Sequence, residues 1–185
     1  MAELVQRRIV YTAEDLRAKV AAMGRQISAD YAGKDLVVIG VLKGSLYFFA
    51  DLTRAIDIPI GIDVIAIGTI PNTTSKTGIV RITKDLDLDI TGKHVLVIED
   101  IIRTGLTTAY LVQNLEARRP ASIKVCSLLV NPGQQLINVP IAYLGYEISD
   151  TWLIGYGMDV HEQGRSLPYI AELERNGSLK APDGR

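Results

Sequence analysis

One segment of the sequence holds residue types that can bind phosphate and sugar groups. It spans residues 95–108 and begins with a continuous apolar run. The residues in it that could do chemistry are Glu99, Asp100, Thr104, Gly105 and Thr107. Adjacent carboxylates suit sugar hydroxyls or a magnesium ion, because both prefer hard oxygen partners. Threonine hydroxyls and the amides of a helix start can surround one phosphate.

The order of these residues predicts a strand, a short loop and a helix start. Ligands of open α/β sheets bind where the carboxyl ends of the strands meet helix N-termini. The segment therefore has the layout of a phosphate site. A strand, an acidic turn and a helix cap also occur together in many proteins that bind no phosphate. On these residues alone both interpretations stay open.

The hydrophobic pattern elsewhere predicts alternating helices and strands. After a possible cap at Thr12, one apolar helix face is formed by Leu16, Val20, Met23 and Ile27. Strands are expected at 35–42, 62–67, 80–82, 94–98, 123–130, 141–144 and 152–154, and further helices from Gly44 to Ala55 and over 107–117. Such alternation favours an α/β fold with a mostly parallel, twisted sheet flanked by helices.

Two segments lack apolar periodicity. Residues 68–78 are mostly polar, which predicts a mobile loop or lid. The polar residues 176–185 are expected to form a disordered tail, which leaves a single domain over 1–175.

Composition limits the possible partners. The 185 residues carry a formal net charge of −1, so no global basic field attracts nucleic acid or an anionic membrane. The longest apolar runs are far shorter than the ~20 residues of a membrane span. The single cysteine, Cys126, excludes an internal disulfide. A cytoplasmic protein that binds small molecules is expected.

The sequence resembles the phosphoribosyltransferases, and most closely their hypoxanthine-guanine branch. Besides 95–108, the likeness rests on Val41–Ser45, Arg81–Asp87, Ile148–Asp159 and Arg165–Ile170, and it covers residues 8–172. It implies a type I phosphoribosyltransferase-like sheet with a small hood. It also implies transfer of phosphoribose from PRPP (5-phosphoribosyl diphosphate) to a base, with Mg²⁺, in a dimer or tetramer.

The resemblance assigns roles to individual residues. For PRPP it implies a 5-phosphate loop of Thr104, Gly105, Leu106 and Thr107, ribose contacts from Glu99 and Asp100, and diphosphate contacts from Lys43, Gly44 and Arg165. Family members can hold the peptide before that lysine, here Leu42–Lys43, in the cis form. For Mg²⁺ it implies Asp159, Glu99 and Asp100, and for the acceptor base it implies Trp152, Leu153 and the position of Asn131. His161 and Glu162 match no catalytic position, so they are expected to be surface residues.

Three positions depart from the family pattern, all on the acceptor side. Arg103 stands where the family has an aspartate that is its candidate general base, and a guanidinium cannot accept a proton. Thr69 and Ile70 replace a Ser-Tyr pair, and Asn131 replaces a lysine that reads the six-oxo group. An engineered Arg103 would not explain the other two departures.

These departures leave three hypotheses. The first is a purine phosphoribosyltransferase weakened by Arg103, and the second is an enzyme with a non-purine acceptor, such as an anionic one. The third is a non-catalytic sensor of PRPP or nucleotides, since a fold does not settle a function.

Overall fold

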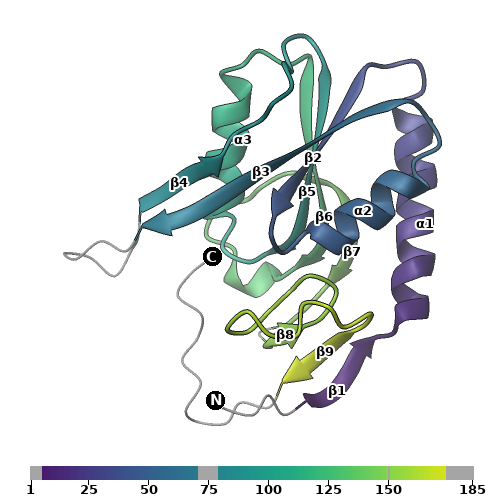
Figure 1. Ribbon diagram of the computed structural model, residues 1–185, viewed down its shortest axis with the longest axis vertical. Helices are drawn as coiled ribbons and strands as arrows, with labels where there is room; N and C mark the ends of the chain where they lie inside the picture. The colour runs from purple at the N-terminus through teal and green to yellow at the C-terminus, as the bar shows by residue number, and fades with distance from the viewer. Residues whose placement is uncertain (1–5, 71–78, 150, 174–185) are drawn as a thin grey trace.

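Two β-sheets and three α-helices make up the part of the chain that the computed structural model describes, residues 6–70, 79–149 and 151–173 (Figure 1). The larger sheet contains β2 (Leu36–Leu42), β3 (Ile60–Ile70), β4 (Ile79–Lys84), β5 (His94–Ile102), β6 (Ser122–Val130) and β7 (Ile141–Glu147). Its spatial order is β4-β3-β2-β5-β6-β7, and only the β3–β4 pair is antiparallel. The predicted fold class is confirmed.

Helices cover both faces of this sheet. They are α1 (Ala13–Asp30), α2 (Leu46–Ala55) and α3 (Leu106–Glu116). Figure 1 shows α1 and α2 together on one side and α3 on the other. The cap predicted at Thr12 is confirmed, since its side chain and that of Asp15 form a reciprocal capping box at the start of α1.

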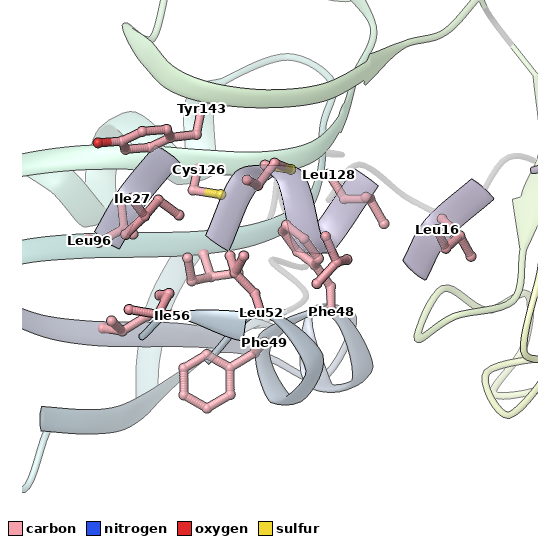
Figure 2. Close-up of a cluster of buried hydrophobic side chains, with 14 of the residues drawn as sticks. Leu16, Ile27, Phe48, Phe49, Leu52, Ile56, Leu96, Cys126, Leu128 and Tyr143 are labelled. Carbon is pink, nitrogen blue, oxygen red and sulfur yellow. The ribbon is translucent and has the colours of Figure 1, made fainter. Parts of the chain in front are cut away.

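The two-sided cover explains the continuous apolar runs in the sequence. Alternate residues of a strand point to opposite faces, so a strand with helices on both sides needs apolar residues throughout. In β5, Leu96 and Ile98 pack with α1 and α2, whereas Val95 and Val97 pack with α3. Figure 2 shows the first cluster, in which Phe48 and Leu52 of α2 meet Cys126 and Leu128 of β6.

A second, smaller sheet forms a hood over one end of the larger sheet. It contains β1 (Gln6–Tyr11), β8 (Leu153–Ile154) and β9 (Ile170–Leu173), in the order β1-β9-β8 with antiparallel pairs. Ile154, Ala171 and Leu173 of this sheet form a hydrophobic cluster with Val160 of the loop between β8 and β9, while Leu153 and Ile170 join the core of the larger sheet. The hydrophobic pattern predicted neither β1 nor β9.

The boundary predicted for the polar loop is wrong. Residues 68–70 belong to β3, because Gly68, Thr69 and Ile70 pair with the returning strand β4. A strand bonded to an antiparallel partner at a sheet edge does not need an apolar run, so its polar residues looked like a loop. Residues 71–78 and the predicted tail 176–185 lie outside the described residues. None of the helices in the described ranges is long and apolar enough to cross a membrane.

Candidate active site

The predicted site residues converge at the carboxyl ends of β2, β5 and β6. These strands are neighbours, and the chain leaves β2 into α2 on one face and β5 into α3 on the other. The connecting loops therefore diverge at this switch point of the sheet, which is where ligands of open α/β sheets bind. The loop between β8 and β9, residues 155–169, is the hood loop. It closes over the same edge, where Gly157 lies against the Gly44 carbonyl.

The carboxylate pair lies inside β5, two residues before its end. Glu99 is buried and accepts a hydrogen bond from Thr108 Oγ1 at 3.2 Å, while Asp100 is half-buried. Burial raises the pKa of Glu99 well above its usual range, and the nearby Asp100 charge raises it further. Burial also raises the pKa of Asp100, although backbone hydrogen bonds and the charges of Arg165 and Arg103 oppose the shift. Both charged forms would be stabilised by hydroxyl donors or a cation.

The loop between β5 and α3 has the geometry of a phosphate cup. Gly105, with φ of 79°, is the N-cap of α3, which has no side-chain cap and no acidic residue in its first turn. By contrast, α1 is capped by its own side chains. A Cβ atom on Gly105 would lie 2.5 Å from the Ile137 carbonyl oxygen, and the amides of Leu136 and Ile137 donate to the Thr104 carbonyl. The loop is thus held in place while its helix start stays open to an anion.

Glycines bring the β2 loop and the hood loop against the carboxylates. A Cβ atom on Gly44 would lie 1.9 Å from Asp100 Oδ2, and one on Gly157 would lie 1.9 Å from the Gly44 carbonyl oxygen. No side chain larger than hydrogen fits at either position without displacing its neighbour. The peptide between Leu42 and Lys43 is cis, as the resemblance implied.

Charged side chains of the hood loop meet Lys43 of the β2 loop. Lys43 Nζ lies 3.0 Å from Glu162 Oε1, and Arg165 Nη2 lies 3.2 Å from Glu162 Oε2. Arg165 Nη2 also lies 2.8 Å from Asp159 Oδ1, and its Nη1 donates to the Gly157 carbonyl at 2.7 Å. Hydrogen bonds from Lys43 and then Arg165 lower the pKa of Glu162.

Glu162 is the residue that sequence reasoning missed. It is exposed, as expected of a surface residue, yet it bridges the two cations assigned to diphosphate. Its place three residues after Asp159 and three before Arg165 was the only available signal. Its contact with Lys43 spans 119 residues and follows from the fold alone.

The residues that the resemblance assigns to the acceptor base are buried or half-buried. Arg103 is half-buried, and its charge opposes the rise that burial causes in the pKa of Asp100. Asn131 is buried, and its backbone amide donates to the Ile102 carbonyl at 2.9 Å. Its side-chain oxygen accepts from Gly133, and its Nδ2 has no hydrogen-bond partner among the described residues. Trp152 is half-buried against the hood cluster, and Leu153 is buried.

Magnesium would need substrate oxygens to complete a site here. In the described ranges no three His, Cys, Asp or Glu side chains gather as a metal cluster, so Glu99, Asp100 and Asp159 do not form one together. Both Asp159 oxygens already accept, from Arg165 and from the Glu162 amide. The adjacent carboxylates in β5 still fit an ion that keeps waters and binds phosphate oxygens, as Mg²⁺ commonly does.

Comparison with known proteins settles the family. The model of the phosphoribosyl transferase domain matches residues 8–161. A hypoxanthine-guanine phosphoribosyltransferase of Mycobacterium tuberculosis is 43% identical over 172 residues, which are 90% of this chain and 85% of that protein. The chain belongs to the hypoxanthine-guanine phosphoribosyltransferase family. The resemblance seen in the sequence is thereby confirmed.

Other members of the hypoxanthine-guanine phosphoribosyltransferase family agree. A hypoxanthine phosphoribosyltransferase of Haemophilus influenzae is 40% identical over 89% of this chain and 94% of that protein. The crystal structure of a hypoxanthine phosphoribosyltransferase from Staphylococcus aureus superposes with a TM-score of 0.89 at 36% identity, covering 95% of each chain. The chain therefore has the type I phosphoribosyltransferase fold that the resemblance implied.

Proposed function

We propose that the protein transfers the phosphoribosyl group of PRPP to a purine base, hypoxanthine or guanine, and releases diphosphate. The observation that carries this proposal is the convergence of three features at one sheet edge. They are the carboxylates of β5, the open N-terminus of α3, and the pair of cations Lys43 and Arg165. Relatives that match nearly the whole chain bear the name of this activity.

Each feature suits one part of PRPP. The 5-phosphate would bind the loop of Thr104, Gly105, Leu106 and Thr107, where amides at a helix start favour negative charge. Glu99 and Asp100 would accept hydrogen bonds from the ribose hydroxyls. Diphosphate would bind Lys43, the Gly44 backbone and Arg165.

The chemistry breaks one bond and forms another at carbon one of the ribose. The bonding electrons leave with the diphosphate, and a ring nitrogen of the base supplies the electron pair of the new bond. Lys43 and Arg165 stabilise the charge that develops on the departing diphosphate. Asp100, Glu99 or Asp159 would hold Mg²⁺, which would supply further neutralisation of the charge on the diphosphate.

The proton of the purine nitrogen has no acceptor at position 103. Arginine stays protonated at any working pH, so Arg103 cannot act as the general base. Loss of such a base costs about 10²–10⁴ in rate, which slows the reaction without abolishing it. We expect purine turnover to be correspondingly slow.

A second acceptor class is favoured by the same residues. Arg103 supplies a positive charge, and Asn131 Nδ2 is a buried donor without a partner in the described ranges. An anionic heterocycle whose reacting nitrogen carries no proton would need no base and would pair with the guanidinium of Arg103. In this second candidate function PRPP is still the donor, and only the acceptor differs.

Release of diphosphate from PRPP and Mg²⁺ with a panel of acceptors tests the proposal. Slow release with hypoxanthine or guanine, and none without a base, is expected. Faster release with an anionic heterocycle would favour the second candidate. PRPP binding without turnover on any acceptor would indicate a sensor instead. A cytoplasmic location and a homo-oligomer stay predictions from the sequence.

A further inference from the structure

Glu162 occupies the place between the two cations that diphosphate needs. Its two carboxylate oxygens divide between them, Oε1 to Lys43 at 3.0 Å and Oε2 to Arg165 at 3.2 Å. A carboxylate that bridges two cations in this way resembles one phosphoryl group of a diphosphate in charge sign and in its acceptor oxygens. An anion that binds both cations therefore competes with this carboxylate for them.

The backbone of Glu162 is held without the ion pairs. Its amide donates to Asp159 Oδ2 at 2.7 Å, and the backbones of Val160 and Gln163 exchange two hydrogen bonds around it. With φ of 62°, Glu162 sits at a tight turn. The turn therefore survives when the carboxylate swings away, and the exposed side chain has solvent to enter.

We propose that Glu162 is a built-in competitor of diphosphate, whose carboxylate holds Lys43 and Arg165 in the free protein and is displaced when PRPP or diphosphate binds. The inference rests on the proposed function, because that function makes these two cations the diphosphate site. It adds a residue that sets affinity without touching the bound substrate.

The ion pairs of Glu162 are weak enough for diphosphate to replace its carboxylate on Lys43 and Arg165. The side chains of Lys43 and Glu162 are 61% and 57% exposed, and such solvated pairs contribute little. Diphosphate carries more negative charge than one carboxylate and, with Mg²⁺, makes further contacts. It therefore wins the competition, at an affinity lowered by the pairs that it breaks. The same competition assists the departure of diphosphate after the reaction.

Isothermal titration of the whole protein with diphosphate and Mg²⁺ tests the proposal. In Glu162→Gln the carboxylate no longer pairs with Lys43 or Arg165, so the Kd should fall about two- to tenfold at low salt, as expected from the loss of one solvated and one partly buried ion pair. The KM for PRPP should fall with it. The difference should shrink as KCl is raised from about 0.05 to about 0.5 M, because salt screens exposed charges.

Two further variants control the experiment. Glu116→Gln removes the same charge at the exposed far end of α3 and should leave the Kd unchanged. Glu162→Asn also removes the charge, and asparagine tolerates a positive φ well, so it should fold and tighten binding as well. A merely structural role for Glu162 would instead weaken binding in both variants at that position.

The outcomes separate this inference from the proposed function. If the parent binds diphosphate and neither Glu162 variant binds it more tightly, the competitor is disproved and the proposed function stands. If neither the parent nor the variants bind diphosphate or PRPP, both fall. Tighter binding in both Glu162 variants, with Glu116→Gln equal to the parent, supports the competitor.

Discussion

At the scale of single residues, burial raises the pKa of Asp100, and the charge of Arg103 is one of the contributions that oppose this rise. In Arg103→Asp, position 103 regains a group that can accept a proton. If the protein uses purines, turnover of hypoxanthine and guanine should rise, by up to ~10²–10⁴ when the whole effect of a general base is recovered. Steady-state kinetics of parent and variant on both purines measures this.

The control for that change is Arg103→Asn, which removes the same positive charge without adding a base. It should leave purine turnover low. Asn131→Lys, combined with Arg103→Asp, should increase purine recognition further. Under the anionic-acceptor alternative, Arg103→Asp should abolish the native reaction, because a carboxylate would repel the acceptor. Brisk purine turnover by the parent would show that another group or water takes the proton.

Glu99 predicts an unusual dependence of stability on pH. Its raised pKa means that the folded protein binds more protons than the unfolded chain at pH values between the unfolded and folded pKa. Stability from this group is therefore present at low pH and is lost as pH rises through that window. Glu99→Gln should melt at a higher temperature than the parent at pH 8, with the difference vanishing below about pH 4, near the unfolded pKa.

Melting curves from pH 4 to pH 8 check this, with Glu116→Gln as the neutralised surface control. The Thr108 hydroxyl can still donate to the glutamine oxygen, so the variant keeps that contact. PRPP should protect Glu99→Gln less than it protects the parent. A lower melting temperature for the variant at pH 8 would show that the buried charge is compensated in the free protein.

The sequence predicted the PRPP-side residues because they lie in short motifs whose local geometry does most of the positioning. Thr104 and Gly105 precede a helix that the apolar pattern reveals. Glu162 could not be found in this way, since its role depends on Lys43, a residue far away in the chain. Trp152 was assigned to the acceptor from a motif, but its packing into the hood core was not visible.

At the scale of elements, the start of α3 depends on the left-handed backbone of Gly105. Gly105→Ala adds a left-handed penalty of ~1–2 kcal/mol and a methyl group that meets the Ile137 carbonyl. The loop must then move, so PRPP affinity should fall at least tenfold. Gly33→Ala is a matched control, because its φ is 74° and its Cβ atom would meet nothing within 4 Å.

Urea unfolding and PRPP titration of both glycine variants separate the two effects. Both should lose stability from backbone strain, Gly105→Ala the more because its methyl group also meets the Ile137 carbonyl, and only Gly105→Ala should lose affinity for PRPP. Equal PRPP affinity in the two variants would mean that the loop before α3 does not hold the 5-phosphate.

Strands with two covered faces were predictable over most of their length, whereas the edge strands β4 and β7 were predicted only in part and the hood strands β1 and β9 were not predicted. The runs that became β2, β5 and β6 are continuously apolar because helices pack on both sides. The end of β3 was missed, because Thr69 and Ile70 pair only with an antiparallel edge strand. The hood strands β1 and β9 are short and carry charged residues, so their pairing is decided by the assembled fold.

At the scale of the whole molecule, ligand binding should appear as added thermal stability. PRPP with Mg²⁺ at 100 times its Kd adds ~2.7 kcal/mol to a protein that binds it only when folded. For a chain of this size the melting temperature should rise by roughly 5–11 °C. Asp100→Asn and Thr104→Val should reduce the shift, and its absence in the parent at millimolar PRPP would defeat the proposed function.

The hood joins the first strand of the described chain to the last, with Arg8 hydrogen-bonded to Glu172 across 164 residues. During synthesis, β1 emerges first and has no partner until β9 leaves the ribosome. The larger sheet pairs its strands without the hood, so it can fold while translation continues, although Leu153 of β8 and Ile170 of β9 later join the core cluster beneath α1 and α2. The acceptor side, which depends on β8, is then completed last. A nascent chain stopped before β9 should have an intact core and no working enzyme.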